Sequence, residues 1–333
     1  MKRYTAAACA AADLIALSIA FGAQAQPGND ASARNYPSRP IRFIVPYPPG
    51  GGTDIVAREL APYLVEAWGQ QVIIDNRGGA SATIGHGITA KATPDGYTMM
   101  LGTSGGLVSS PLFGVQTNYI PLKDFEPIGM LADIPFVVAV PTSLPANNIR
   151  ELIDLSKSRP DGLNLASPGA GTPNHLSGEL LKVRSGIRFV HVPYKGGGPA
   201  MTDLIAGEMH FLFTGVPQLL PHVRSGRLRI IASGHPVRSR LAPDAAPIAD
   251  VYPGFNSSTW FCLLLPAGTS KAIAAKFNAQ LNLIITSTDF GNRISLQGAE
   301  PATSTPAQVM EKIRSETERW RKVIKDAGLA TGG

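Results

Sequence analysis

The chain has few of the residues that form disulfides or bind metals. It contains two cysteines in 333 residues, and only Cys262 follows the first 25 residues. A single cysteine cannot form an internal disulfide, so the fold must depend on core packing, and we expect Cys262 to be buried in the apolar run 261–265. The six histidines include no closely spaced pair, and no CxxC motif is present. The sequence therefore predicts no metal site.

Signatures of nucleotide and nucleic-acid binding are also missing. No lysine follows a glycine-rich loop in the Walker pattern, and the glycines at 50–52 lack the later glycine of a dinucleotide-binding turn. The formal net charge is +6, but lysine and arginine are scattered, with no run of five. We therefore expect no cofactor and no nucleic-acid partner, and the basic balance favours anionic partners only weakly.

Long apolar runs are absent except near the start of the chain. Lys2 and Arg3 precede a mostly apolar stretch at 6–21, and Ala23-Gln24-Ala25 is a small-x-small cleavage pattern. Residues 1–25 are therefore interpreted as a secretory signal peptide, and residues 26–36 as a disordered lead-in. The alternatives are a membrane anchor, for which the uninterrupted apolar run is too short, and a lipoprotein attached through Cys9.

Short apolar runs alternate with helix-like segments over the rest of the chain. The runs are at residues 41–45, 72–74, 97–101, 136–140, 163–166, 189–192, 211–213, 228–232 and 261–265. Helical periodicity or helix-start signals mark residues 55–67, 149–158, 173–183, 199–206, 271–285 and 306–327. Continuous apolar runs are typical of parallel strands covered on both faces, so the pattern predicts an α/β fold.

Two segments suggest that the chain crosses between two domains. Residues 136–141 and 261–266 resemble each other, since each is an apolar strand followed by proline. If both are crossings, domain 1 comprises residues 37–138 plus 260–333, and domain 2 comprises residues 139–259. A cleft between two such domains is a common place for a small ligand, and Trp260 beside the second crossing could stack on an aromatic one.

Glycine-rich junctions between a strand and a helix are the candidate functional sites. At a helix start the first N–H groups have no partner within the helix, and the helix dipole places about half a positive charge there, which favours an anion. Ligands of open α/β sheets bind at the carboxyl ends of strands, where these junctions lie. The candidate ligand-binding residues are Tyr47, Pro48, Gly51, Gly52, Thr53, Asp54, Ser104, Ser167, Ala170, Gly171, Thr172, Tyr194, Gly196 and Thr214.

Two of these junctions are expected to hold one carboxylate each. In the first, the N–H groups of Gly51, Gly52 and Thr53 are the donors, while Asp54 supports the turn or binds a positive group. In the second, the donors are the N–H groups of Ala170 and Gly171 with the hydroxyls of Ser167 and Thr172. His175, one turn into the following helix, is expected to be a packed structural residue.

Five motifs occur in the order in which they occur in a known family. They are YPPGGGTDIVAREL at 47–60, GQQVIIDNR at 69–77, ATPDGYTMMLG at 92–102, ASPGAGTPNHLSGELL at 166–181 and VPYKGGGPAMTDLIAGEM at 192–209. The chain resembles the Bug-type receptors, the periplasmic solute-binding proteins of tripartite tricarboxylate transporters. After Asn76-Arg77 the family usually has Pro-Gly-Ala-Gly-Gly, whereas this chain has Gly-Gly-Ala-Ser-Ala. Residues 243–247 likewise blur the family's Pro-Asp-Val-Pro-Thr.

The resemblance implies a two-domain periplasmic binding protein of the Venus flytrap, type II-like kind, with two strands crossing between the lobes. It implies a monomer without catalytic activity. Its ligand would be a small mono- or dicarboxylate, aliphatic or aromatic, held between the lobes. Its partners would be the membrane subunits of the transporter.

Two other functions remain open from the residues alone. Residues 102–106, GTSGG, match the nucleophile elbow of serine hydrolases, with Ser104 as nucleophile, Asp203 as acid and His235 as base. The segment 107–114 is a poor helix, however, because it contains serines, a proline and a glycine. A signalling receptor that presents its ligand to a membrane sensor is the third possibility, and the sequence does not separate it from transport.

Overall fold

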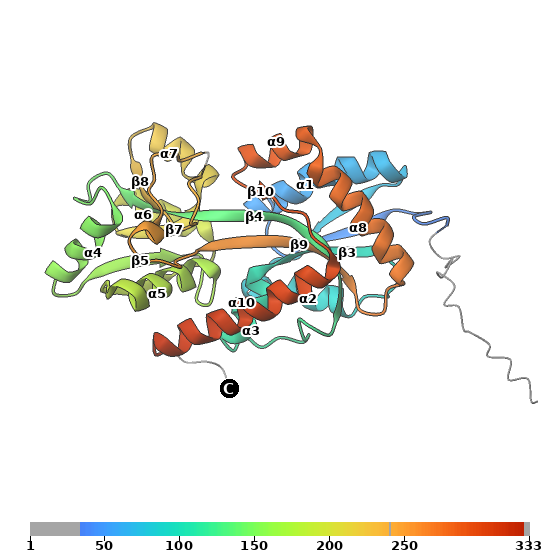
Figure 1. The fold of residues 1–333 in the computed structure, drawn as a ribbon, viewed down its shortest axis with the longest axis horizontal. Coiled ribbons are helices and arrows are strands. Elements are labelled where there is room, and N and C mark those ends of the chain that lie inside the picture. The colour runs from blue at the N-terminus through green and yellow to red at the C-terminus, as the bar shows by residue number, and fades with distance from the viewer. Residues whose placement is uncertain (1–33, 240, 330–333) are drawn as a thin grey trace, which may run out of the picture.

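The computed structural model describes residues 34–239 and 241–329, which form a two-lobed α/β protein (Figure 1). The predicted signal peptide and residues 26–33 of the predicted lead-in lie outside the described residues. Tyr36, which was assigned to that lead-in, is buried, and its hydroxyl donates to the carbonyl of Gly96. None of the helices in the described ranges is long and apolar enough to cross a bilayer.

One sheet runs through both lobes, and its first part has the strand order β2-β1-β3-β9-β4. Strands β1, β2 and β3 are parallel, whereas β9 is antiparallel to both β3 and β4. The short β10 pairs with β4. The bounds are β1 (Ile41–Val45), β2 (Val72–Asn76), β3 (Thr98–Thr103), β4 (Phe125–Pro141), β9 (Ser258–Pro266) and β10 (Glu300–Pro301). These strands and the helices on them are the first lobe.

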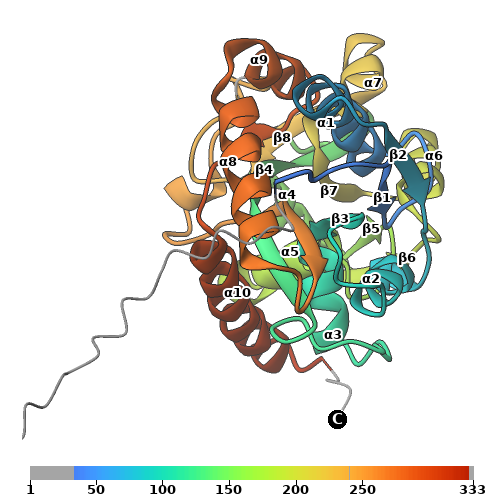
Figure 2. The ribbon, with the colours of Figure 1, turned by 90° about the vertical axis from the view of Figure 1, so that its right-hand side faces the viewer.

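Helices cover both faces of this part because its strands are apolar on both sides. Phe43 and Val45 pack against α1, α8 and α9, while Ile44 packs into the other core, toward η3 and α10. Figure 2 shows α1, α8 and α9 around these strands. The bounds are α1 (Gly52–Trp68), η2 (Ala80–Ala82), α2 (Thr83–Ala90), η3 (Gly105–Ser109), α3 (Ser110–Leu112), α8 (Lys271–Thr286), α9 (Thr288–Leu296) and α10 (Pro306–Asp326).

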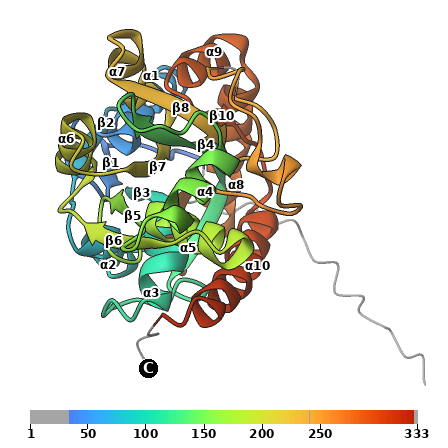
Figure 3. The same cartoon turned by 90° about the vertical axis from the view of Figure 1, so that its left-hand side faces the viewer.

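The second lobe continues the sheet in the order β4-β7-β5-β6, with β8 also paired to β4 (Figure 3). Strands β5, β6 and β7 are parallel, and β4 is antiparallel to β7 and β8. The strands are β5 (Leu163–Ser167), β6 (Phe189–Pro193), β7 (Phe211–Gly215) and β8 (Leu228–Ser233). The helices are α4 (Ile149–Ser158), α5 (Pro173–Ser185), α6 (Gly197–Ala206), η4 (Val216–Gln218), α7 (Leu220–Arg224) and η5 (Ile248–Asp250).

Strand β4 belongs to both lobes. It pairs with β9 as far as Pro135, opposite Ser258, and with β7 from Phe136 onward. The sequence placed the domain boundary at 138/139, so the division of the chain into two domains stays a prediction. Helix α10 packs on β4, η3 and α5, and therefore joins the two lobes along one side.

The α/β prediction is confirmed, and each of the nine apolar runs coincides with a strand, although Tyr97 precedes β3 by one residue. The sequence missed α2, α9 and the first half of β4. Cys262 is fully buried, as expected. Trp260 is 1% exposed and lies under the Lys312 ammonium, 5.7 Å from the ring centre, so it offers no open face to a ligand.

Candidate functional site

The first glycine-rich turn leaves backbone donors without protein partners. Gly50 has a φ of 84°, a conformation that glycine adopts without strain, and α1 then begins without a side-chain cap. The first helical bond runs from Ile55 N–H to the Gly51 carbonyl. Within the described residues, the N–H groups of Gly51, Gly52 and Thr53 donate to no protein atom. Their positive ends are available to an anion.

The buried carboxylate of Asp54 accepts hydrogen bonds that fix the conformation of this turn. One carboxylate oxygen accepts from Gly50 N–H at 2.9 Å and Arg58 Nε at 2.8 Å, and the other accepts from Asn76 Nδ2 at 3.0 Å. Burial raises the pKa of Asp54, but these hydrogen bonds together hold the pKa below its usual value. Both oxygens thus have protein partners, and Asn76 also ties the turn to the carbonyl of Tyr47.

A second loop of the first lobe, at residues 78–82, packs against this turn. Gly78 lies so close that a Cβ there would sit 2.8 Å from Cδ of Pro48. The next residues, Ala80, Ser81 and Ala82, have φ values of 45°, 53° and 79°. This conformation is uncommon for residues other than glycine, and Ser81 and Ala82 stand where the related family usually has glycine. Residues 80–82, where the sequence departs from the family pattern, therefore form a strained backbone segment beside the candidate site.

Tyr47 and Ser104 stand at the ends of β1 and β3. Burial raises the pKa of the Tyr47 phenol, so the hydroxyl stays protonated. A Cβ at Gly105 would lie 2.9 Å from the Tyr47 hydroxyl oxygen and 3.9 Å from Cδ of Pro173, the first residue of α5. Tyr47 of the first lobe and the start of α5 in the second lobe therefore meet at Gly105.

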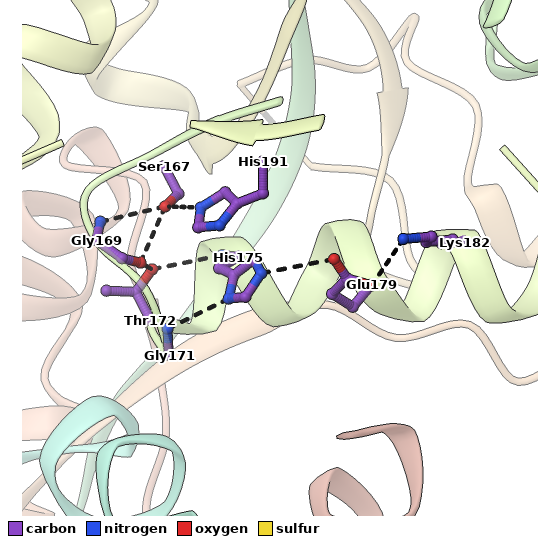
Figure 4. A network of polar contacts seen from close by, with 8 residues as sticks. All are labelled: Ser167, Gly169, Gly171, Thr172, His175, Glu179, Lys182 and His191. Carbon is purple, nitrogen blue, oxygen red and sulfur yellow. Dashed lines mark hydrogen bonds and ion pairs between the residues drawn. The ribbon is translucent and has the colours of Figure 1, made fainter. Parts of the chain in front are cut away.

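The loop before α5 is held by its own side chains (Figure 4). The hydroxyls of Ser167 and Thr172 donate to the Gly169 carbonyl at 2.9 and 2.7 Å, and Thr172 caps α5 by accepting from His175 N–H. Gly171 N–H donates to Nδ1 of His175 at 3.2 Å.

These bonds change the expectation for this loop. Ala170 and Gly171 were both expected to offer free N–H groups, but that of Gly171 is already paired. Ala170 N–H, on an exposed residue, donates to no protein atom within the described ranges. The hydrogens of the Ser167 and Thr172 hydroxyls are directed at the Gly169 carbonyl. The Ser167 oxygen is also engaged by Gly169 N–H and His191 Nε2, so the Thr172 oxygen is the one that can still accept a hydrogen bond.

The third junction lies between β6 and α6. Gly196 has a φ of 120°, and its N–H donates to the carbonyl of Pro168 at 2.9 Å, which ties this loop to the one before α5. Tyr194 is turned toward its own lobe, where its hydroxyl donates to Asp203 at 2.6 Å. Burial and the Asp203 carboxylate raise the pKa of Tyr194 to about 12.

Gln218 connects the lobes, although the sequence analysis did not single it out. Its Oε1 accepts from the Thr214 hydroxyl at 3.2 Å. A Cβ at Gly52 would lie 4.0 Å from its Nε2, and one at Gly197 would lie 3.8 Å from its Oε1. The amide of Gln218 thus stands between the starts of α1 and α6, which belong to different lobes. Its place three residues after the end of β7 is the signal that could have identified it.

The three residues of a possible hydrolase triad lie in separate environments. The Ser104 hydroxyl is 2.8 Å from that of Thr259, and Asp203 accepts from Tyr194. The Nδ1 of His235 lies near the backbone of Val237. Ser104 therefore has a hydroxyl partner and no general base.

Comparisons with known proteins identify the family and the fold. A family model described as the tripartite tricarboxylate transporter family receptor, TctC, matches residues 56–329. Protein BugT of Bordetella pertussis is 37% identical over 322 residues, covering 95% of this chain and 97% of BugT. The solved structure of R. palustris Rpa4515 with adipate is 33% identical, with a TM-score of 0.83 over 89% of this chain and 99% of that one. MatC from Rhodopseudomonas palustris with bound malate is 28% identical, with a TM-score of 0.78 over 87% and 100%.

The fold is therefore that of the two-lobed periplasmic binding proteins, as the sequence predicted. The family and the similar structures are solute-binding receptors and not enzymes, so the serine hydrolase alternative is wrong. The chain belongs to the family of tripartite tricarboxylate transporter receptors, and it is similar to the Bug protein BugT.

Proposed function

We propose that this protein is a periplasmic receptor that captures a small mono- or dicarboxylate between its lobes and delivers it to the membrane subunits of a tripartite tricarboxylate transporter. The observation that carries the proposal is the group of N–H donors at Gly51, Gly52 and Thr53, which have no protein partner within the described residues and lie at a helix start beside Gln218 of the other lobe. Adipate in one similar structure and malate in another support the same ligand class.

The energetics of backbone recognition are sufficient. A hydrogen bond to a charged group contributes about 1.5–3 kcal/mol, and micromolar affinity requires about 8 kcal/mol net. Three donors on one carboxylate and further contacts on the opposite lobe reach that range without a basic side chain. Arg58, a basic residue in the second turn of α1, is engaged by Asp54.

Gly52 is the most informative position for a mutational test. It is the first residue of α1, where proline is well tolerated, and the preceding Gly51 has the extended backbone that proline requires (φ −81°, ψ 164°). Gly52→Pro removes one N–H donor, whereas the matched control Gly52→Ala keeps the donor and has room for its Cβ. Gly171 is a poor position for the same test, because its φ of 72° excludes proline.

Calorimetric titration with adipate and malate measures the effect. We expect Gly52→Pro to weaken binding by about tenfold or more, the value of one lost hydrogen bond to a charged group, and Gly52→Ala to bind within about threefold of the parent. Both variants should melt close to the parent temperature. Equal affinity of the proline variant and the parent would contradict the proposed site, and no binding of a carboxylate panel would contradict the ligand class.

The cellular role follows from the same proposal. We propose that residues 1–25 are cleaved on export, that the protein acts as a monomer, and that the lobes correspond to residues 37–138 plus 260–333 and residues 139–259. Uptake of the bound carboxylate should fall when the gene is deleted. Normal uptake with loss of a transcriptional response to the same carboxylate would favour the signalling receptor instead.

A further inference from the structure

His175 lies directly behind the loop 167–172 of the second lobe. It is 3% exposed, and its Nδ1 accepts from Gly171 N–H at 3.2 Å. The other ring nitrogen, Nε2, lies 3.5 Å from a carboxylate oxygen of Glu179, which is also buried and pairs with Lys182 at 3.7 Å. Figure 4 shows these groups in one row along α5.

The two neighbours of the ring determine where its proton resides. A nitrogen that accepts from a backbone N–H must be unprotonated, so Nδ1 carries no hydrogen in this arrangement. The neutral ring then has its hydrogen on Nε2, pointing to Glu179. A second proton could only go to Nδ1, where it would face the Gly171 N–H and break that bond.

A second histidine, His191, stacks on the face of the His175 ring. His191 of β6 stacks on His175 with ring centres 3.7 Å apart, and its Nε2 is 2.6 Å from the Ser167 hydroxyl. Burial and then the neighbouring His175 lower the pKa of His191 to about 3. Two rings at this distance cannot both be charged without strong repulsion. Both ends of the loop, Ser167 and Gly171, are therefore bonded to a pair of stacked rings.

The charged and titratable groups that face His175 come from two elements. Glu179 and Lys182 belong to α5 itself, and His191 belongs to β6. Phe113, which follows α3 in the first lobe, contributes only an uncharged ring edge at 5.3 Å. Within the described residues, β5, β7, β9, η3 and α10 place no charged side chain in a hydrogen bond or ion pair with His175.

We propose that His175 is a positioning residue for ligand binding: it holds the Gly171 amide, and with it the loop that presents Ala170 N–H, only while its Nδ1 is unprotonated. Loss of that acceptor then weakens the binding of a carboxylate. This inference rests on the proposed function for its consequence, but the bond between His175 and Gly171 exists without a ligand.

The bond can be tested in the ligand-free protein by NMR. The nitrogen shifts of the His175 ring report its tautomer, and the amide shift of Gly171 reports its acceptor. We expect the ring hydrogen on Nε2 and none on Nδ1, and we expect the Gly171 amide shift to change when His175 is replaced by leucine. A hydrogen on Nδ1, or a Gly171 amide shift that is the same in His175→Leu, would overturn the proposal even if no carboxylate binds.

Three variants test the consequence, with adipate and malate as probes at a pH of about 8, where both ligands are fully ionised. His175→Asn keeps an acceptor near the position of Nδ1, so it should bind within about threefold of the parent. His175→Leu removes the acceptor and should bind about tenfold more weakly. His222→Asn on α7, where the ring bonds to Arg227 at 3.0 Å, is the matched control and should bind as the parent does.

The outcomes separate the two proposals. Thermal unfolding of each variant shows whether it is folded. A folded His175→Leu that binds as the parent does, or a folded His175→Asn that binds as weakly as His175→Leu, would each refute the positioning role. A parent protein that binds neither adipate nor malate nor any other carboxylate would refute the proposed function, while the NMR measurement still decides the role of His175.

Discussion

A buried histidine in the first lobe illustrates how single residues are constrained. His86 is fully buried, with Nδ1 at 2.8 Å from the Ala82 carbonyl and Nε2 at 3.5 Å from Thr103 N. The ring stacks on Tyr119 and lies so close to Gly106 that a Cβ there would be 2.2 Å from the ring. Glycine is therefore required at residue 106, and His86 holds together the strained segment at Ala82 and the end of β3.

This residue makes stability depend on pH. Burial lowers the pKa of His86 from 6.5 to about 4, so between these values the unfolded chain binds more protons than the folded one. The contribution of His86 to the free energy of unfolding is therefore fully present above about pH 6.5 and is lost as the pH falls toward 4. The difference amounts to about 3 kcal/mol, which urea denaturation at the two ends of the range measures.

His86→Phe separates this residue from the other titrating groups. The variant keeps a ring against Tyr119 but cannot titrate, so its stability should fall less on acidification, even though it starts lower because Thr103 N–H loses its acceptor. His191 continues to contribute a slope in the same direction, since burial and His175 lower the pKa of His191 to about 3. An unchanged slope in His86→Phe would show that His86 does not control the acid response.

In helix α1, burial of the apolar face outweighs the low helix propensity of a proline in its interior. This is one helix from Gly52 to Trp68 although Pro62 lies inside it, where proline leaves the Arg58 carbonyl without its helical donor. Val56, Leu60 and Leu64 are fully or almost fully buried against α8 and α9 and the sheet. The apolar face keeps the helix in place, and with it the donors at its start.

We expect Pro62→Ala to stabilise the protein by about 1–3 kcal/mol, because it restores a helical hydrogen bond on an exposed surface. Pro306→Ala is the matched control, since Pro306 is the first residue of α10, where proline costs nothing. Urea denaturation of both variants gives the comparison. A loss of stability in Pro62→Ala would mean that the surrounding structure has adapted to the proline.

At the scale of the whole molecule, the lobes share their secondary structure. Strand β4 pairs with strands of both lobes, and α10 packs on both. One apolar core contains buried residues from each lobe, including Trp260 of β9 and Trp320 of α10 from the first and Phe213 of β7 from the second. The lobes also touch directly, because Gly171 leaves so little space that a Cβ there would lie 2.8 Å from Cβ of Phe113.

Because of this shared core, we expect the ligand-free protein to unfold in one cooperative transition. Far-UV circular dichroism and tryptophan fluorescence should give the same urea midpoint, since Trp260 and Trp320 lie in the shared core and Trp68 lies in the first lobe. Two separated transitions would show that the lobes unfold independently.

The local part of this structure could be read from the sequence. Apolar runs and helix caps are short-range signals, so the strands, most helices and the turn at Gly50–Gly52 were predicted, and motifs along the chain indicated the family. Among the elements that were missed, α2 is short and begins after three residues with positive φ. No propensity favours that conformation without glycine.

Which donors remain available to a ligand was decided by tertiary structure. The sequence placed N–H groups at two helix starts, but it could not show that Gly171 donates to His175, that both oxygens of Asp54 are engaged within its own lobe, or that Gln218 stands between α1 and α6. The helix start itself is a local property, because it depends on unpaired amides within one turn. The pairing of those amides depends on side chains that only the folded chain brings near, so it is a property of the whole fold.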